Sequence, residues 1–383
     1  MAGIYIHIPF CKQACFYCDF HFSTSLKKKE ALIQALVKEI ELRKEELSNQ
    51  SIDTIYFGGG TPSLLAVDEL QLLIDTVYKN FRVTDDPEIT LEANPDDLSI
   101  KQISGLADAP INRLSIGIQS FFEEDLKAMN RAHNAQEAKA CLKHASKYFD
   151  NITIDLIYGI PNMGLEKWDD NLNMAFDFGI NHISSYALTV EPKTALDSFV
   201  KKGTYPPIDE NLALSHFNHL IDRTQAEGFV HYETSNFGKP DYFSRHNTSY
   251  WQGKSYLGIG PSAHSFYGNQ RRWNISNNPK YIKAIQKSKL PNTVEILSLK
   301  DQYNEYVMTG LRTIWGVSLD KVKNEYGEKR FQYLKTGAEK FISQGLLAVS
   351  SEAKDDGNYT DTLITTQKGK FLVDGIASEL FMI

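Results

Sequence analysis

Three cysteines within a short stretch constrain this chain more than any other feature of its sequence. Cys11, Cys15 and Cys18 stand in the spacing C-x3-C-x2-C near the beginning of the chain. A structural zinc site normally closes with four protein ligands. Three thiolates on a [4Fe–4S] cluster instead leave one iron without a protein ligand. Because such an iron can bind a further molecule, the spacing predicts an iron–sulfur cluster that takes part in chemistry.

A zinc site or a purely structural cluster is the alternative interpretation of these cysteines. His7 precedes Cys11 closely enough to be considered as a fourth ligand. The aromatic residues Phe16 and Tyr17 between the cysteines favour the cluster, because a shielded environment with few hydrogen-bond donors lowers its reduction potential.

Composition excludes several classes of protein. Only four cysteines occur, and the remaining one, Cys141, is expected to be a small buried apolar residue. This usage indicates a reducing cytoplasm rather than a disulfide scaffold. The formal charge is −7, and Lys27–Lys29 is the longest basic run, so we expect no nucleic-acid partner. No apolar run approaches the roughly 18 residues that a membrane span needs, and the first residues do not resemble a signal peptide.

Alternating strand-like and helix-like segments predict an α/β fold. We expect strands at residues 3–8, 54–57, 88–93, 113–118, 152–158 and 182–188, with the clearest helices at 28–48 and 67–80. Strands that alternate with helices form βα units around a parallel sheet. Six units predict a partial (β/α)6 barrel, smaller than a full barrel of eight.

The pattern changes after the sixth unit and predicts three domains. Residues 1–205 would form the partial barrel, residues 206–295 a segment that completes it, with a helix at about 209–227, and residues 296–383 a C-terminal domain. In the last, helices at 299–313, 318–327 and 331–345 precede strands at 346–350 and 361–366 and a helix at 368–381. This order is typical of a small α+β, winged-helix-like domain. Such domains often bind DNA, but the acidic charge argues against it.

Polar residues follow successive predicted strands at their carboxyl ends. In strand order they are the cysteine loop, Gly58–Thr61, Glu92, Gln119 and Asp155. The carboxyl ends of parallel strands meet at one rim of a barrel, where the ligand site lies. The sequence therefore predicts chemistry at this rim.

Each of these residues also has a structural interpretation. The Gly58–Gly60 run lacks the Gly-Lys-Ser/Thr ending of a phosphate loop, so it is either a tight turn or a place where a small ligand approaches the backbone. Glu92 either caps a helix near Pro95 or accepts hydrogen bonds from a ribose or an ammonium group. Arg131 either forks onto a ligand carboxylate or forms a surface ion pair.

The segment His246-Asn-Thr-Ser-Tyr-Trp251 gathers a histidine, an amide and two large aromatic residues. One interpretation is an aromatic-rich loop that caps the barrel. The other is an axial haem ligand with neighbours that stack on the ring, because haem iron commonly takes a histidine. A second histidine, His264, follows in a glycine-rich turn.

Together these motifs resemble the radical S-adenosylmethionine (SAM) superfamily. They are most similar to the branch that contains oxygen-independent coproporphyrinogen III oxidase (HemN) and the haem chaperone HemW, and His246-Asn-x-x-Tyr-Trp251 resembles HemW in particular. The resemblance implies that Cys11, Cys15 and Cys18 hold the cluster, whose open iron chelates SAM. It places the following residues at the contacts with that cofactor: Tyr5, Tyr17, Gly59, Gly60, Thr61, Glu92, Gln119, Arg131, Asp155 and Ala187.

The resemblance leaves two principal functions. The first is a haem chaperone in which His246 contacts haem, with a haem-acceptor protein and an electron donor to the cluster as partners. The second is an oxidative decarboxylase of coproporphyrinogen III. The first cysteine is already residue 11, which we expect to leave no room for the N-terminal element that helps to cover the oxidase's substrate. A radical enzyme acting on another substrate is a third alternative, and no catalytic side chain is predicted.

Overall fold

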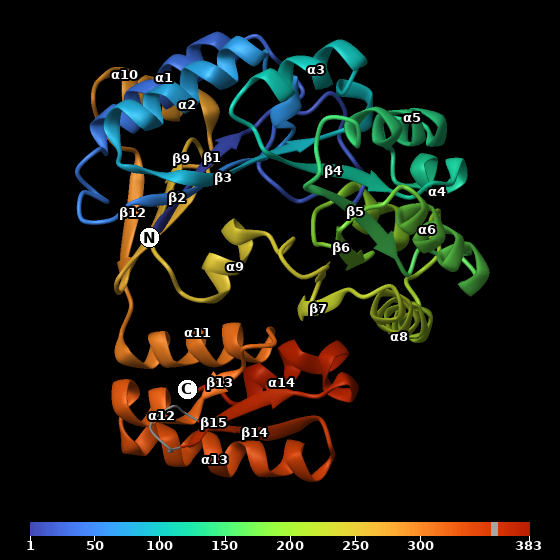
Figure 1. Ribbon diagram of the computed structural model, residues 1–383, viewed down its shortest axis with the longest axis vertical. Coiled ribbons are helices and arrows are strands. Elements are labelled where there is room, and N and C mark those ends of the chain that lie inside the picture. The colour runs from blue at the N-terminus through green and yellow to red at the C-terminus, as the bar shows by residue number, and fades with distance from the viewer. Residues whose placement is uncertain (354–358) are drawn as a thin grey trace.

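Six parallel strands form the centre of the protein. The computed structural model describes residues 1–353 and 359–383 (Figure 1). The six strands lie side by side in chain order: β1 (Ala2–Ile8), β2 (Ile52–Gly59), β3 (Val83–Ala93), β4 (Arg113–Gln119), β5 (Ile152–Tyr158) and β6 (His182–Ala187). They are parallel throughout. Their outer face is covered by helices: α1 (Lys29–Leu42), α2 (Val67–Asn80), α3 (Ile100–Asp108), α4 (Glu123–Ala128), α5 (Ala135–Ala145), α6 (Leu165–Asp177) and α8 (Glu210–Ala226). The short helix α7 (Ala195–Lys201) instead lies beside the cysteine loop, where Leu196 N donates to the carbonyl of Phe16, 2.9 Å. The predicted partial (β/α)6 barrel is confirmed.

The two faces of the strands differ in chemistry. In β3, Ile89 and Leu91 belong to the main hydrophobic core, whereas Glu88, Thr90 and Glu92 alternate with them. Successive side chains of a strand point to opposite faces, so the apolar residues meet the helices and the polar residues face the inside of the barrel. The interior is therefore polar, and it must be filled by hydrogen-bonded groups or by a ligand.

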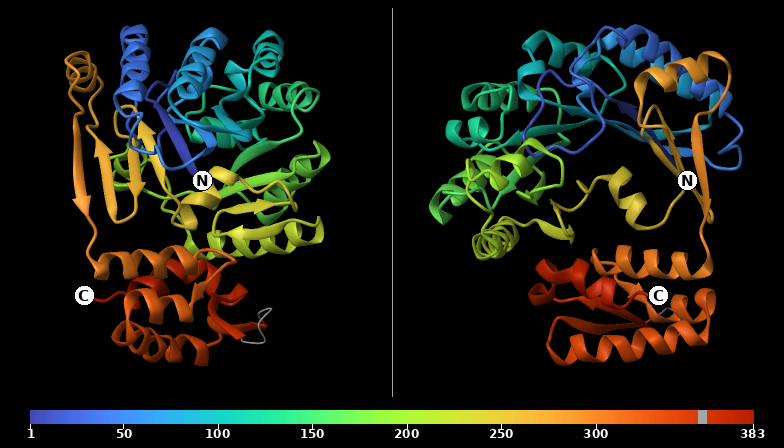
Figure 2. Two further views of the ribbon diagram at one scale, coloured as in Figure 1. Left: turned by 60° about the vertical axis from the view of Figure 1, so that its left-hand side comes forward. Right: turned by 180° about the vertical axis from the view of Figure 1, so that it is seen from behind.

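The sheet continues beyond both edges of the parallel strands. At one edge, β8 (Asn236–Gly238) pairs antiparallel with β6, and β7 (Val230–Glu233) pairs with β8. At the other edge, β9 (Tyr256–Ile259) pairs parallel with β1. An antiparallel extension follows, made of β10 (His264–Tyr267), β11 (Gln270–Asn274) and β12 (Asn292–Ile296), with α10 (Asn278–Gln286) on its outside. The connection between the two edges carries the short helix α9 (Arg245–Trp251), which lies inside the curve of the sheet (Figures 1 and 2).

The C-terminal part of the chain has a hydrophobic core of its own. Buried residues from Tyr303 to Leu380 form a second cluster, separate from the barrel core. Its elements are α11 (Leu299–Leu311), β13 (Val317–Ser318), α12 (Leu319–Lys321), a π-helical turn (Val322–Tyr326), α13 (Glu328–Ser343), β14 (Leu347–Ala353), β15 (Tyr359–Thr365), a 3-10 helix (Gln367–Leu372) and α14 (Val373–Glu379). The unit lies against one end of the barrel (Figure 2), where the turn after α11 bonds β7 through Ile314 N to Tyr232 O, 3.1 Å.

The structure differs from the sequence prediction at three helices. The predicted helix at 318–327 is the three-residue α12 followed by the π-helical turn. The predicted helix at 28–48 ends at Leu42, and the Arg43 side chain that follows turns inward to Glu39 and to the carbonyl oxygen of Gly258, 2.7 Å away. The predicted final helix at 368–381 divides into a 3-10 turn and α14. In the 3-10 turn, Gly369 packs directly on the carbonyl of Leu346, where a side chain would not fit. Within the described residues, no helix is long and apolar enough to cross a membrane.

Candidate functional site

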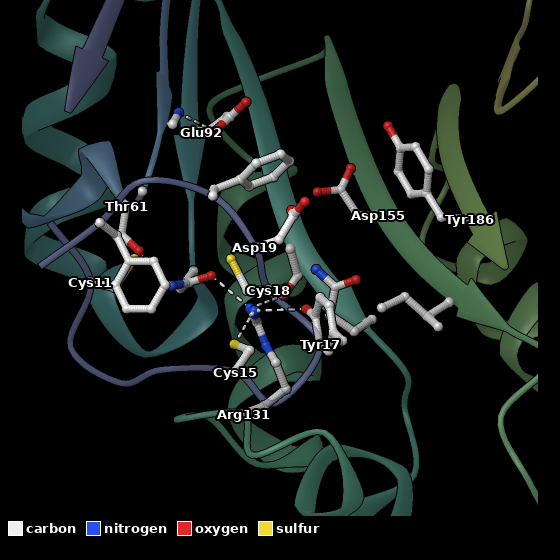
Figure 3. Close-up of a pocket in the computed structure, with 18 of the residues that line it drawn as sticks. Cys11, Cys15, Tyr17, Cys18, Asp19, Thr61, Glu92, Arg131, Asp155 and Tyr186 are labelled. Atoms are coloured by element: carbon white, nitrogen blue, oxygen red, sulfur yellow. Dashed lines mark hydrogen bonds between the residues drawn. The ribbon is translucent and has the colours of Figure 1, made fainter. Parts of the chain in front are cut away.

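A cavity of about 470 Å³ opens at the carboxyl ends of the parallel strands (Figure 3). Its size is within the range of small-ligand sites. The predicted site residues that line it are Cys11, Cys15, Tyr17, Cys18, Gly59, Gly60, Thr61, Glu92, Gln119, Arg131, Asp155 and Ala187. The fold thus brings together all but two of the residues selected from the sequence.

Backbone hydrogen bonds hold the cysteine loop over this cavity. Its two ends are tied together where Cys11 N donates to the carbonyl of Ser23, 3.1 Å. In the middle, the loop is clamped by Asn130, whose side-chain amide donates to the carbonyl of Ala14, 2.7 Å, and accepts from Gln13. Asn130 itself adopts the left-handed conformation (φ 57°), which asparagine tolerates better than most residues. The loop is therefore positioned by contacts that do not need a bound cofactor.

The donor set suits an iron–sulfur cluster. Cys11, Cys15 and Cys18 are half-buried free thiols at one end of the cavity. Burial raises the pKa of Cys11 to about 11 and also raises the pKa of Cys18, so both need a metal to hold them as thiolates. Among the described residues, no three His, Cys, Asp or Glu side chains converge as ligands of one ion.

His7 does not join the cysteines. Its Nδ1 lies 3.1 Å from the hydroxyl of Tyr5, and its Nε2 lies 3.2 Å from the carbonyl oxygen of His21. Both ring nitrogens are thus engaged away from the cavity, which disfavours a zinc site completed by this histidine.

The glycine run forms one wall of the cavity. Gly59 has φ +107°, and a Cβ there would come within 2.4 Å of the His7 ring. A Cβ at Gly60 would come within 2.6 Å of the carbonyl oxygen of Phe10. Packing against the end of β1 therefore requires glycine at both positions. The backbone amide of Gly59 donates to the Glu92 carboxylate at this wall of the cavity.

Carboxylates dominate the polar lining. Among the described residues, Asp19, Glu92, Asp155 and Glu191 line the cavity with a single cationic side chain, Arg131. Burial raises the pKa of Glu92, against the hydrogen bonds it accepts. Burial and the Glu92 carboxylate raise the pKa of Asp155 to about 7. A cavity with this balance favours a ligand that carries positive charge.

Arg131 bridges the cysteine loop and the strands. Its guanidinium donates to the side-chain oxygen of Asn94, 2.6 Å, and to the carbonyl of Gly117, 2.9 Å. It also approaches Cys15 Sγ and the hydroxyl of Tyr17, both at 3.4 Å. Its Nε is buried and lacks a hydrogen-bond partner within the described part of the chain. Because Arg131 is the cationic residue of the described lining, it is the side chain there that could attract a ligand carboxylate.

Several lining residues were not selected from the sequence. They include Asp19, Asn94 and Tyr186 (Figure 3 labels Asp19 and Tyr186). Asp19 directly follows Cys18, and Asn94 directly follows the end of β3, so position alone could have indicated both. Tyr186 lies on the same face of β6 as Ser184 and His182. This position indicates a lining residue only once that face of the strand is known to point into the barrel.

Tyr5 and His246 lie outside the cavity. Tyr5 packs behind it against Tyr56, with ring centroids 6.1 Å apart. His246 lies on α9, only 1% exposed, with Nδ1 2.7 Å from Thr54 Oγ1 and Nε2 2.6 Å from the hydroxyl of Tyr250. The aromatic segment is thus a helix inside the barrel rather than a capping loop. Haem ligation by His246 stays a prediction, and it would require one of these two hydrogen bonds to break, because an imidazole binds iron through a single ring nitrogen.

Comparison with known proteins identifies the relatives of this chain. Residues 5–175 match the radical SAM superfamily, and residues 297–353 match the HemN C-terminal domain. A heme chaperone HemW of Bacillus subtilis is 32% identical over 360 residues, which cover 92% of this chain and 94% of the relative. A heme chaperone HemW of Escherichia coli is 38% identical over 68% of this chain and 69% of the relative.

One solved structure shares the fold over the whole chain. The radical SAM enzyme coproporphyrinogen III oxidase (HemN) from Escherichia coli superposes with a TM-score of 0.84 at 22% identity, covering 100% of this chain and 90% of that one.

Proposed function

The chain belongs to the HemW family within the radical SAM superfamily, and from that membership we propose that it is a haem chaperone that carries a [4Fe–4S] cluster and binds SAM. The observation that carries the proposal is the identity with proteins named heme chaperone HemW along nearly the full chain. Its proposed partners are an acceptor protein that takes the haem and a donor that reduces the cluster.

The cavity supports the cofactor part of the proposal. Cys11, Cys15 and Cys18 would hold the cluster, because they supply three thiolates at one end of the cavity. When bound together, the cluster and SAM supply a one-electron cleavage of the sulfonium C–S bond. The carboxylates of Glu92 and Asp155 would favour the cationic sulfonium and ammonium groups, and Arg131 would receive the carboxylate.

The charge of haem does not suit this cavity, which favours the cationic groups of SAM. Its two propionate groups are anionic, and four carboxylates line the cavity among the described residues. Like charges in a site of low dielectric repel strongly. We therefore place haem at a surface other than this cavity, and we expect haem and SAM to bind together rather than compete.

A haem titration tests the proposal. The reconstituted protein and the cluster-free protein are each titrated with haem, with and without saturating SAM, and binding is followed by the Soret band. Apomyoglobin then serves as a test acceptor. We expect saturable haem binding of unchanged affinity with SAM present, followed by transfer to apomyoglobin. Absence of saturable binding would contradict the chaperone function, and displacement of haem by SAM would contradict the separate sites.

The oxidase alternative is distinguished by its product. The reconstituted protein is incubated anaerobically with coproporphyrinogen III, SAM and a reductant. We expect no protoporphyrinogen, and its formation over many turnovers would replace the chaperone by a decarboxylase.

A further inference from the structure

His246 of α9 lies outside the cavity but is connected to it through Tyr56, which contacts both His246 and the cavity-lining Glu92. The His246 ring stacks on the Tyr56 ring, with centroids 4.9 Å apart and an interplanar angle of 23°. Tyr56 Oη in turn donates to Glu92 Oε1, 2.8 Å away. The other Glu92 oxygen, Oε2, accepts from the Gly59 amide, 3.1 Å away. One aromatic ring thus connects the buried imidazole to a carboxylate that lines the cavity.

This arrangement is tightly packed. The Tyr5 ring is adjacent to both others, with centroids 6.1 Å from the Tyr56 ring and 6.4 Å from the His246 ring, so the three rings form one cluster. A Cβ at Gly58 would come within 2.9 Å of both tyrosine rings, and a Cβ at Gly3 would come within 3.1 Å of the imidazole. Close packing of this kind transmits the position of one side chain to the next. Tyr56 therefore has little room to turn while the imidazole is present.

Hydrogen bonds to neighbouring residues fix the imidazole of His246 in place. Its ring nitrogens are occupied by Thr54 and Tyr250. The first turn of α9 is held by Glu88, which accepts from the backbone amides of Arg245 and His246 at 2.8 and 2.9 Å. Burial lowers the pKa of His246 to about 3, so the ring is neutral. A neutral, fully bonded imidazole suits a fixed support.

We infer that His246 is a positioning residue for the SAM site: its ring holds the Tyr56 hydroxyl, and through it the Glu92 carboxylate, in the orientation that faces the cavity. The inference rests on the proposed binding of SAM in that cavity. It gives the aromatic segment a role that needs no contact with haem.

A second histidine provides a matched control. His182 is also fully buried, with Nδ1 2.9 Å from Thr153 Oγ1 and Nε2 2.7 Å from the hydroxyl of Tyr232. The Thr–His–Tyr arrangement is the same, but His182 makes no ring contact with Tyr56. His182→Ala therefore reproduces the loss of a buried imidazole without the loss of this stack.

A double-mutant cycle on SAM affinity tests the inference. SAM binding to the cluster-loaded protein is measured by equilibrium dialysis and by the electron paramagnetic resonance signal of the reduced cluster. We expect His246→Ala and Tyr56→Phe each to weaken binding roughly tenfold, since each disturbs a hydrogen bond to a charged group. In the Tyr56→Phe background, His246→Ala should add little. His182→Ala should bind SAM as the wild type does.

Haem titration of the same variants separates the alternatives. His246→Ala should keep the wild-type Soret band. Loss of that band with unchanged SAM affinity would overturn the inference in favour of an axial ligand, and fully additive effects of His246→Ala and Tyr56→Phe would also overturn it. If His246→Ala does not fold, His246→Gln, which lacks the ring but can still bond Thr54, replaces it in the cycle. A wild-type protein that binds no SAM would instead refute the proposed function, and the inference with it.

Discussion

The Asp155 carboxyl makes the folded protein sensitive to pH. Burial, with the neighbouring Glu92 carboxylate, raises its pKa from 3.8 to about 7. A raised pKa means that the folded state holds the proton more tightly than the unfolded chain does. The free energy of unfolding therefore falls as pH rises from the unfolded to the folded pKa, and the loss is complete above about pH 7. A rise of about 3 pH units corresponds to an upper limit of about 4 kcal/mol.

Replacing this carboxyl by an amide should remove the penalty. Asp155→Asn is expected to raise the free energy of unfolding at about pH 8 by up to about 4 kcal/mol, and to change little at about pH 4, where the acid is protonated in the folded state. Urea denaturation of the cluster-free protein at both pH values measures the difference, with the exposed Asp177→Asn as the control. A variant no more stable than the wild type at the higher pH would refute the reasoning.

The same carboxyl should link SAM binding to pH. A cationic ligand in the cavity favours the ionised form of Asp155, so binding should release a proton. SAM affinity is then expected to rise as pH rises through about 7 in the wild type. Asp155→Asn should bind SAM more weakly and lose this pH dependence. Asp155→Asn would then be more stable than the wild type but bind SAM more weakly, which is the common trade-off between stability and function.

Two further perturbations address the cysteine loop. Alanine at Cys11, Cys15 or Cys18 should abolish the brown chromophore of the anaerobically reconstituted protein, whereas Cys141→Ala, a change in the buried core, should retain it; absorption spectra and iron content decide. Asn130→Ala should lower the free energy of unfolding by roughly 1–2 kcal/mol, because it loses the bond to Ala14 and places alanine at φ 57°. Glycine tolerates this backbone conformation, so Asn130→Gly should regain the part of the unfolding free energy that Asn130→Ala loses to backbone strain. Urea denaturation measures the difference. Equal stability of the wild type, Asn130→Ala and Asn130→Gly would contradict the role of Asn130 as a clamp.

Much of the barrel could be read from the sequence because its signals are local. Each parallel strand is a compact run that alternates apolar and polar residues, and the residues at its carboxyl end reach one rim. The cysteine loop, Gly58–Thr61, Glu92, Gln119 and Asp155 followed from this rule without any knowledge of contacts, whereas Tyr17 and Ala187 were placed at the site by the family resemblance. The resemblance also placed Tyr5 at the cofactor, but Tyr5 lies in the middle of its strand and packs behind the cavity against Tyr56.

The edges of the sheet could not be read in the same way. The strand Asn236–Gly238 has three residues and is fixed by pairing with β6, far away in the sequence. Such short polar segments carry no periodic signal of their own. The helix Arg245–Trp251 also lacks an apolar stripe, because tertiary contacts inside the barrel stabilise it instead. In the structure, the helix begins at a cap by Ser244, whose side chain accepts from Asn247 N.

The position of a residue along the barrel, more than its chemical type, decides its role. We call the layer beside α9 the lower level and the layer that lines the cavity the upper level. Glu88 and Glu92 lie on the same face of one strand, four residues apart, and both are carboxylates. Each oxygen of Glu88 accepts from a backbone amide of α9, and the buried Arg113 guanidinium lies 3.9 Å from one of them, so the protein itself closes the lower level. Glu92 accepts from Tyr56 and Gly59 and still lines the cavity, so the upper level remains open to a ligand. His246 belongs to the closed level but contacts the open one through Tyr56. A substitution in α9 should therefore be judged first by what it does to the cavity above it.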